Sequence, residues 1–310
     1  MRVFVTGASG HIGSALVPEL LAAGHKVIGL ARSDTSAAAL SSAGVEVRRG
    51  DLDDLDGLRQ AAAAADGVIH LAFKHDVAFT GDYAGAAAAE FRAVEAIGAA
   101  LEGSGKPFVS TAGTLALALG GSGRMGTEDD AREGGPRIDS ENAVIALGKR
   151  GVRSSVIRLA PTVHSSLDHH GFVPSLITMA RKNGFAAYVG DGANRWPTVH
   201  TLDATRLYRL ALETAPAGSR LHGAAEEGIP FRDIAEAIGR GLGLPAVSIS
   251  AEDAGKHLGF LAMFAQLDNP TSSVRTRELL RWQPTHPGLL ADLAERHYFE
   301  PPGASRKEAP

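Results

Sequence analysis

Three glycines spaced three residues apart follow the apolar run Val3 to Val5 near the start of the chain. A strand, a glycine-rich turn and a helix in this order bind anions, because free backbone N–H groups and the positive end of the helix dipole face the turn. Gly7 permits a tight turn, Gly10 lets the backbone approach a pyrophosphate, and Gly13 lets the helix pack on the strand. The turn Thr6 to Gly13 therefore predicts a dinucleotide site rather than an ordinary strand-to-helix connection.

The residues after the second expected strand, Lys26 to Leu30, indicate which dinucleotide fits. At this point NAD-binding proteins place a carboxylate on the ribose 2′-hydroxyl, whereas NADP-binding proteins place a basic group. Arg32 offers a guanidinium that can grip a phosphate with two donors, and Ser33 adds a hydroxyl. Asp34 is the counter-evidence, and we interpret it as the N-cap of the following helix. We therefore predict that NADP(H) is preferred over NAD(H).

Groups that can exchange protons follow the fourth expected strand at Lys74, His75 and Asp76. Ligands of doubly wound sheets bind beyond the carboxyl ends of the strands, so these side chains are expected near the substrate. His75 has a pKa suited to proton transfer near neutrality, and Asp76 or a more distant carboxylate can orient it. The alternative interpretation is a solvated loop histidine without a role.

The elements that must position these groups are short β-branched runs that alternate with helix-length segments through the first half of the chain. This alternation predicts an α/β fold, a Rossmann-type doubly wound parallel sheet. After Pro161 the rhythm breaks, and a helix at 203–214 and a strand at 220–222 then indicate a return to the sheet. We expect an NAD(P)-binding Rossmann domain at 1–163 plus about 200–225, a smaller interleaved C-terminal substrate domain or cover at 164–199 and 226–300, and a tail at 301–310.

Composition limits the partners of the protein. The 310 residues are 44% hydrophobic and 21% charged, and the net charge of −4 includes no basic block, so we expect a globular protein with no nucleic acid partner. No apolar stretch approaches the roughly 18 residues that cross a bilayer, which favours a cytoplasmic protein with no membrane contact. The absence of cysteine excludes disulfides and thiolate chemistry. We expect a small-molecule substrate and a monomer or homodimer.

The spacing Gly-x-x-Gly-x-x-Gly, preceded by Thr6, resembles the short-chain dehydrogenase/reductase superfamily in its extended, epimerase/dehydratase-like branch. Four further segments are similar to family elements: Gly50 to Leu52, His70 to Ala72, Arg158 to Val163, and Leu280 to Pro284, in which Arg281 replaces a glycine. The pattern of Arg195, Val199, His200, Asp203 and Ala204 also matches that branch. The resemblance thus covers nearly the whole chain.

The turn and this resemblance together imply a set of cofactor contacts. They are Gly7, Ser9, Gly10, His11, Ile12, Gly13, Arg32, Ser33, Asp51, Leu52, Leu71, Ala72, Phe73, Thr111, Leu159, Ala160, Pro161 and Thr162.

The catalytic pair of the superfamily is a Tyr followed four residues later by a Lys, and this sequence lacks it. The residues four positions after Tyr83, Tyr188, Tyr208 and Tyr298 are Ala, Gly, Leu and Pro, respectively. By its distance before the strand that starts at Val152, the expected position places Arg137 where the Tyr belongs and Glu141 where the Lys belongs. An exposed ion pair between these two residues is one interpretation, and an Arg137 that polarises a substrate oxygen is the other. The family's Ser falls within 110–114, where Ala112 is the best match and Thr111 or Thr114 can supply a hydroxyl.

The catalytic candidates are therefore His75, Lys74, Thr111 and Arg137. The substrate candidates are His164, His170, Tyr188, Arg195 and Trp196, although Trp196 and Pro197 can equally pack between domains. Asp168, His169 and His170 suggest a substrate cover, and we predict no metal.

The leading hypothesis is an NADPH-dependent oxidoreductase that reduces a carbonyl or an activated alkene with a non-standard proton donor. A non-catalytic dinucleotide sensor and a nucleotide-sugar epimerase or dehydratase are the alternatives.

Overall fold

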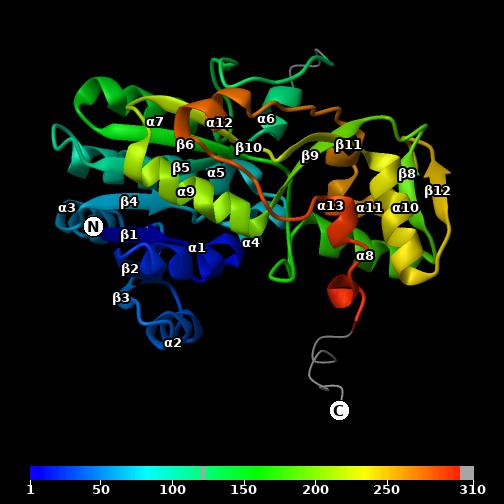
Figure 1. Ribbon diagram of the computed structural model, residues 1–310, viewed down its shortest axis with the longest axis horizontal. Coiled ribbons are helices and arrows are strands. Elements are labelled where there is room, and N and C mark those ends of the chain that lie inside the picture. The colour runs from blue at the N-terminus through cyan, green and yellow to red at the C-terminus, as the bar shows by residue number, and fades with distance from the viewer. Residues whose placement is uncertain (120–122, 301–310) are drawn as a thin grey trace.

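The central sheet has seven strands within the described part of the chain, and all of its pairings are parallel. The computed structural model describes residues 1–119 and 123–300 (Figure 1). The strand order is β10-β6-β5-β4-β1-β2-β3, with bounds β1 Arg2–Thr6, β2 Lys26–Ala31, β3 Glu46–Arg49, β4 Gly67–His70, β5 Pro107–Gly113, β6 Arg153–Leu159 and β10 Ser219–Gly223. The order reverses at β1, so the predicted doubly wound Rossmann-type fold is confirmed.

Helices cover both faces of this sheet (Figure 1). Successive residues of β1 show why, since Val3 and Val5 enter one hydrophobic cluster and Phe4 enters the other. The first cluster includes α1 (His11–Ala22), α2 (Asp34–Ser42) and α9 (Thr201–Thr214). The second includes α3 (Leu55–Ala64), α5 (Tyr83–Leu101) and α7 (Ile138–Leu147). Short helices α4 (His75–Phe79), α6 (Leu115–Ala118) and η1 (Gly148–Arg150) complete this part.

A second, smaller group of elements lies beside the sheet, at the right in Figure 1. Its strands are β7 (Thr162–His164), β9 (Arg195–His200) and β11 (Glu226–Pro230) in one small sheet, and β8 (Ala186–Val189) with β12 (Ala246–Ile249) in another. Its helices are α8 (Phe172–Asn183), α10 (Phe231–Leu242), α11 (Ala254–Leu258), η2 (Gly259–Leu261), η3 (Phe264–Gln266), α13 (Leu289–Asp292) and η4 (Arg296–Tyr298). Trp196, Phe231 and their neighbours form a separate core here.

The chain returns to the central sheet in its second half, as the sequence predicts. Strand β10 pairs with β6 in parallel, and the strand expected at 220–222 is confirmed. Helix α12 (Val274–Leu280) ends at Arg281, which adopts the left-handed conformation with φ 50° where the family has glycine. The expected tail at 301–310 lies outside the described residues, and no helix among those described is long and apolar enough to cross a membrane.

Candidate functional site

The glycine-rich turn has the geometry that a dinucleotide requires. Gly7 has φ +70°, and a Cβ there would come within 2.9 Å of the Ala72 nitrogen. A Cβ on Gly13 would come within 2.1 Å of the Gly7 carbonyl oxygen, so only glycine allows helix α1 to pack against the turn. Gly10 is the N-cap of α1, whose start has neither a side-chain cap nor an acidic residue. The free N–H groups of this helix end therefore fit a pyrophosphate.

His11 connects the turn to the second half of the chain. Its Nε2 lies 2.9 Å from Thr201 Oγ1, and its Nδ1 lies 3.7 Å from a carboxylate oxygen of Asp168. Burial and neighbouring histidines lower the pKa of His11 to about 4, so the ring is neutral at pH 7. The sequence indicates His11 as a cofactor contact, but its long-range bond to α9 was not predicted.

The N-cap of α2 is Ser33, so the prediction that Asp34 caps this helix is wrong. Ser33 has extended backbone and its hydroxyl accepts a bond from Ser36 N at 3.1 Å, whereas Asp34 is already in the first helical turn. The Asp34 side chain is 96% exposed, and its carboxylate forms an ion pair with Arg49. Arg49 also donates to the Ser33 carbonyl oxygen.

Two arginines therefore flank Ser33 at the end of β2. The sequence predicts Arg32 as a phosphate ligand, and that prediction does not include Arg49. Only the sheet brings Arg49 here, because Arg49 ends β3 and pairs in register with Ala31, which ends β2. The Arg32 side chain is 66% exposed, and its guanidinium lies 3.0 Å from Asp76, whose pKa it lowers.

Two further segments with expected cofactor contacts, 50–52 and 70–72, lie at the ends of β3 and β4. Asp51 accepts bonds from the backbone nitrogens of Asp53 and Asp54, and Leu52 is buried. Ala72 N donates to Thr6 Oγ1 at 3.2 Å, which fixes the segment after β4 against the glycine-rich turn.

Lys74, four residues after the end of β4, forms an ion pair. Its ammonium forms an ion pair with Asp53, a residue that Arg92 of α5 also approaches. The lysine proposed as a catalytic candidate is thus bound to a carboxylate.

Arg137 lies in a buried ion pair, and the expected exposed pair with Glu141 does not form. The guanidinium of Arg137 binds both carboxylate oxygens of Glu90 on α5 at 2.9 and 3.1 Å and donates to the Thr111 carbonyl oxygen at 3.0 Å. Arg137 precedes α7 in the left-handed conformation with φ 63°, so its side chain leaves the helix face that carries Glu141. Although burial opposes its charge, Glu90 raises the pKa of Arg137, which stays cationic.

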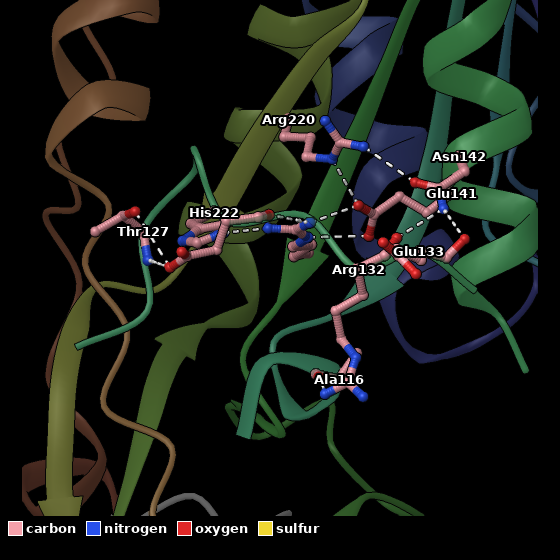
Figure 2. Close-up of polar contacts among 10 residues, drawn as sticks. Ala116, Thr127, Arg132, Glu133, Glu141, Asn142, Arg220 and His222 are labelled. Carbon is pink, nitrogen blue, oxygen red and sulfur yellow. Dashed lines mark hydrogen bonds and ion pairs between the residues drawn. The ribbon is translucent and has the colours of Figure 1, made fainter. Parts of the chain in front are cut away.

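Glu141 instead belongs to a buried cluster between α7 and strands β6 and β10 (Figure 2). It binds Arg158 at 2.5 and 2.9 Å and Arg220 at 2.8 Å. Arg158 also contacts the Nε2 of His222 at 3.3 Å, and burial lowers the pKa of His222 to about 4. The residue that stands where the family has Lys therefore has a structural ion-pair role.

The hydroxyl proton of Thr111 is already used. Thr111 Oγ1 donates to the His70 carbonyl oxygen at 2.9 Å and lies 2.7 Å from the Tyr208 hydroxyl. Because a hydroxyl has one proton, Tyr208 must donate to Thr111 in this arrangement. Thr114 differs, since its Oγ1 accepts from Asn269 Nδ2 at 2.9 Å and keeps its own proton.

An aromatic cluster forms around Phe73 at the end of β4. The Arg137 guanidinium lies 4.4 Å from the centre of the Phe73 ring, and the His75 ring lies 5.0 Å from it. Burial and the nearby Arg137 lower the pKa of His75. Tyr83, at the start of α5, lies 6.0 Å from Phe73, and burial raises its pKa. Sequence reasoning missed Tyr83 and Glu90 because their contacts depend on how α5 packs.

The substrate candidates are dispersed. Trp196 is fully buried against Phe231 and donates to a backbone carbonyl, so it belongs to the core and not to a pocket wall. Arg195 binds Asp268 with two nitrogens, and His164 is buried beside Asp292 at 2.8 Å. The other two candidates are Tyr188, which is half-buried in β8, and His170, which is exposed beside His169.

Comparisons with known proteins agree with this architecture. Residues 3–133 match the model of the NAD dependent epimerase/dehydratase family. The chain is 47% identical to protein C2A9.02 of Schizosaccharomyces pombe over 96% of its length and 100% of the relative's. It is 28% identical to 2'-dehydrokanamycin reductase of Streptomyces kanamyceticus over 99% of this chain and 82% of the relative.

Among solved structures, DesIV, a dTDP-glucose 4,6-dehydratase from Streptomyces venezuelae with NAD bound, superposes with a TM-score of 0.74. The sequence identity is 20%, and 96% of each chain is covered, so this likeness concerns the fold. The resemblance inferred from the glycine spacing is confirmed. The chain belongs to the NAD-dependent epimerase/dehydratase family and has the fold of the extended short-chain dehydrogenases/reductases.

Proposed function

We propose that the protein is an NADP(H)-dependent oxidoreductase that reduces a carbonyl group or an activated alkene of a small molecule. The observation that carries the cofactor choice is the pair of arginines, Arg32 and Arg49, on either side of Ser33. Two guanidinium groups favour a 2′-phosphate. The Asp34 carboxylate, the acidic group that could serve a ribose hydroxyl instead, is paired through one oxygen with Arg49.

In this proposal the bound dinucleotide supplies the hydride, and a side chain of the protein must donate the proton to the substrate. Of the four catalytic candidates, Lys74 is paired, Arg137 stays charged and the Thr111 proton is used. His75 is the candidate that can gain and lose a proton at moderate pH. We therefore assign the proton transfer to His75, with Arg137 attracting the substrate oxygen.

The relative named 2'-dehydrokanamycin reductase supports reduction as the chemistry. The lack of a Tyr followed four residues later by Lys favours a dinucleotide sensor instead, and the DesIV likeness keeps a nucleotide-sugar dehydratase as the other alternative. Turnover and the identity of the retained cofactor separate these functions. Tight NADPH binding without turnover of any aldehyde, ketone or enone would favour the sensor, and release of NAD from the denatured protein would favour the sugar-nucleotide enzyme.

The cofactor preference is tested by titrating NADPH and NADH into wild type, Arg32→Ala and Arg49→Ala. We expect each substitution to reduce the NADPH preference by about tenfold or more, because each removes a charge-assisted bond to phosphate. Arg150→Ala is the matched control, since this exposed arginine pairs with Glu102 on another part of the surface. An unchanged preference in both variants, or a wild type that prefers NADH, contradicts the proposal.

His75→Ala is expected to reduce kcat for carbonyl reduction by about 100-fold while NADPH affinity stays near that of wild type. Because the pKa of His75 is lowered, the donating imidazolium form increases as pH falls, so the wild-type reduction rate should rise toward acidic pH. Steady-state rates over a pH series measure both effects. A variant that keeps the wild-type rate and pH profile removes His75 from the mechanism.

A further inference from the structure

A cavity of about 220 Å³ opens beyond the carboxyl end of β5. Its walls come from α6, from residues 123–132 and from the segment 268–270. Asn269, a wall residue, donates to Thr114, the residue that follows β5. The cavity thus adjoins the edge of the sheet where doubly wound folds bind ligands. Its volume far exceeds the roughly 15 Å³ that one water needs.

The cavity wall carries two arginines, Arg124 and Arg132, and two aspartates, and both aspartates are paired with an arginine other than Arg132. Asp130 pairs with Arg124, and Asp268 pairs with Arg195. Arg132 is different, because no acidic side chain within the described ranges, 1–119 and 123–300, lies at ion-pair distance from it. Its side chain donates to the Ala116 carbonyl oxygen at 3.2 Å. Because Asp268 is paired with Arg195, which lies outside the lining, Arg132 is the wall cation that no described carboxylate pairs with.

The backbone around Arg132 is held by the buried cluster (Figure 2). Arg158 Nη2 donates to the Asp130 carbonyl oxygen at 2.7 Å. Asn142 Nδ2, itself next to Arg220, lies 2.9 Å from the Arg132 carbonyl oxygen and also approaches that of Glu133. In Figure 2 the side chain of Arg132 points away from this cluster toward Ala116. A fixed backbone on both sides of a half-buried guanidinium preorganises it for a ligand.

We propose that Arg132 binds a carboxylate of the substrate, so that the substrate is a small oxo acid or unsaturated acid rather than a neutral carbonyl compound. This inference rests on the proposed oxidoreductase function. A planar guanidinium matches the two oxygens of a carboxylate. One arginine without an acidic partner among the described residues, with two aspartates in the same wall, suits a monovalent anion better than a phosphate ester, whose charge approaches −2 at neutral pH.

The test compares matched acids and methyl esters, namely pyruvate with methyl pyruvate and 4-oxopentanoate with methyl 4-oxopentanoate, by NADPH oxidation. We expect wild type to prefer the acid by about tenfold or more in kcat/KM, and Arg132→Gln to lose this preference through KM. Glutamine keeps a donor for Ala116 but no charge, and Arg132→Lys should retain part of the preference. Arg240→Ala, on the exposed face of α10, is the control that removes an equal charge elsewhere.

Binding without turnover separates this inference from the proposed function. The non-reacting acid pentanoate is titrated by calorimetry into the NADPH-loaded protein, with methyl pentanoate as the neutral comparison. Saturable pentanoate binding that Arg132→Gln abolishes supports the carboxylate site even if no carbonyl is reduced, in which case the oxidoreductase proposal fails alone. Equal kcat/KM for acid and ester, a preference that survives Arg132→Gln, or no pentanoate binding overturns the inference.

Discussion

Glu141→Gln is expected to lower the free energy of unfolding by about 3 to 5 kcal/mol, the largest effect on stability that we predict. Glu141 is the acidic partner of both Arg158 and Arg220, and the Arg158 side chain is only 2% exposed. Removing the carboxylate charge leaves Arg158 and Arg220 without an acidic side chain at ion-pair distance in the described part of the chain. Urea unfolding followed by circular dichroism measures the difference between wild type and variant.

The shifted pKa of Glu141 also makes the free energy of unfolding depend on pH. Burial raises the pKa of Glu141, but hydrogen bonds and charges from Arg158 and Arg220 outweigh burial and hold the pKa below its usual value. The stabilisation is therefore fully present above the unfolded pKa of about 4.3, and it is lost as pH falls through the lower folded pKa. Wild type should lose more stability than Glu141→Gln over this acidic interval.

Glu102→Ala is the matched control for Glu141, because Glu102 pairs with Arg150 in an exposed ion pair. Exposed pairs contribute little to stability, so this variant should unfold close to wild type. If Glu141→Gln unfolded like Glu102→Ala, the buried cluster would not have the structural role that we assign to it.

Gly13→Ala is expected to weaken dinucleotide binding by more than about 100-fold. The added Cβ would lie 2.1 Å from the Gly7 carbonyl oxygen and 2.6 Å from the Ala8 carbonyl carbon, and both are backbone atoms. A clash with backbone costs about 3 kcal/mol and can be relieved only by opening the turn that cradles the pyrophosphate. Fluorescence titration with NADPH measures the affinity.

Gly255→Ala is the control for this variant, because Gly255 lies in α11 and a Cβ there meets nothing within 4 Å. It should bind NADPH as wild type does. Circular dichroism shows whether Gly13→Ala remains folded at the temperature of the titration. A folded Gly13→Ala protein with wild-type affinity would contradict the assignment of the turn as the pyrophosphate site.

The sequence by itself determined the strand and helix order of the first half and the position of the glycine-rich turn. These features have local causes. Short hydrophobic runs favour strands, and the spacing of Gly7, Gly10 and Gly13 is typical of one turn that binds a dinucleotide. Arg32 is a candidate from the sequence alone because its place after a strand is a local feature. The preference for NADP(H), which depends on that residue, stays a proposal.

Only the tertiary structure decided which charges meet. Arg49 reaches Ser33 because β2 and β3 are neighbours, and Arg137 binds Glu90 rather than Glu141 because its backbone is left-handed and α5 lies beside it. The same packing leaves Arg132 bonded to the Ala116 carbonyl oxygen, with no acidic partner among residues 1–119 and 123–300. The contacts of Arg49 and Arg137 join residues that are far apart in the sequence. No local pattern predicts these contacts, because each depends on the packing of whole strands and helices.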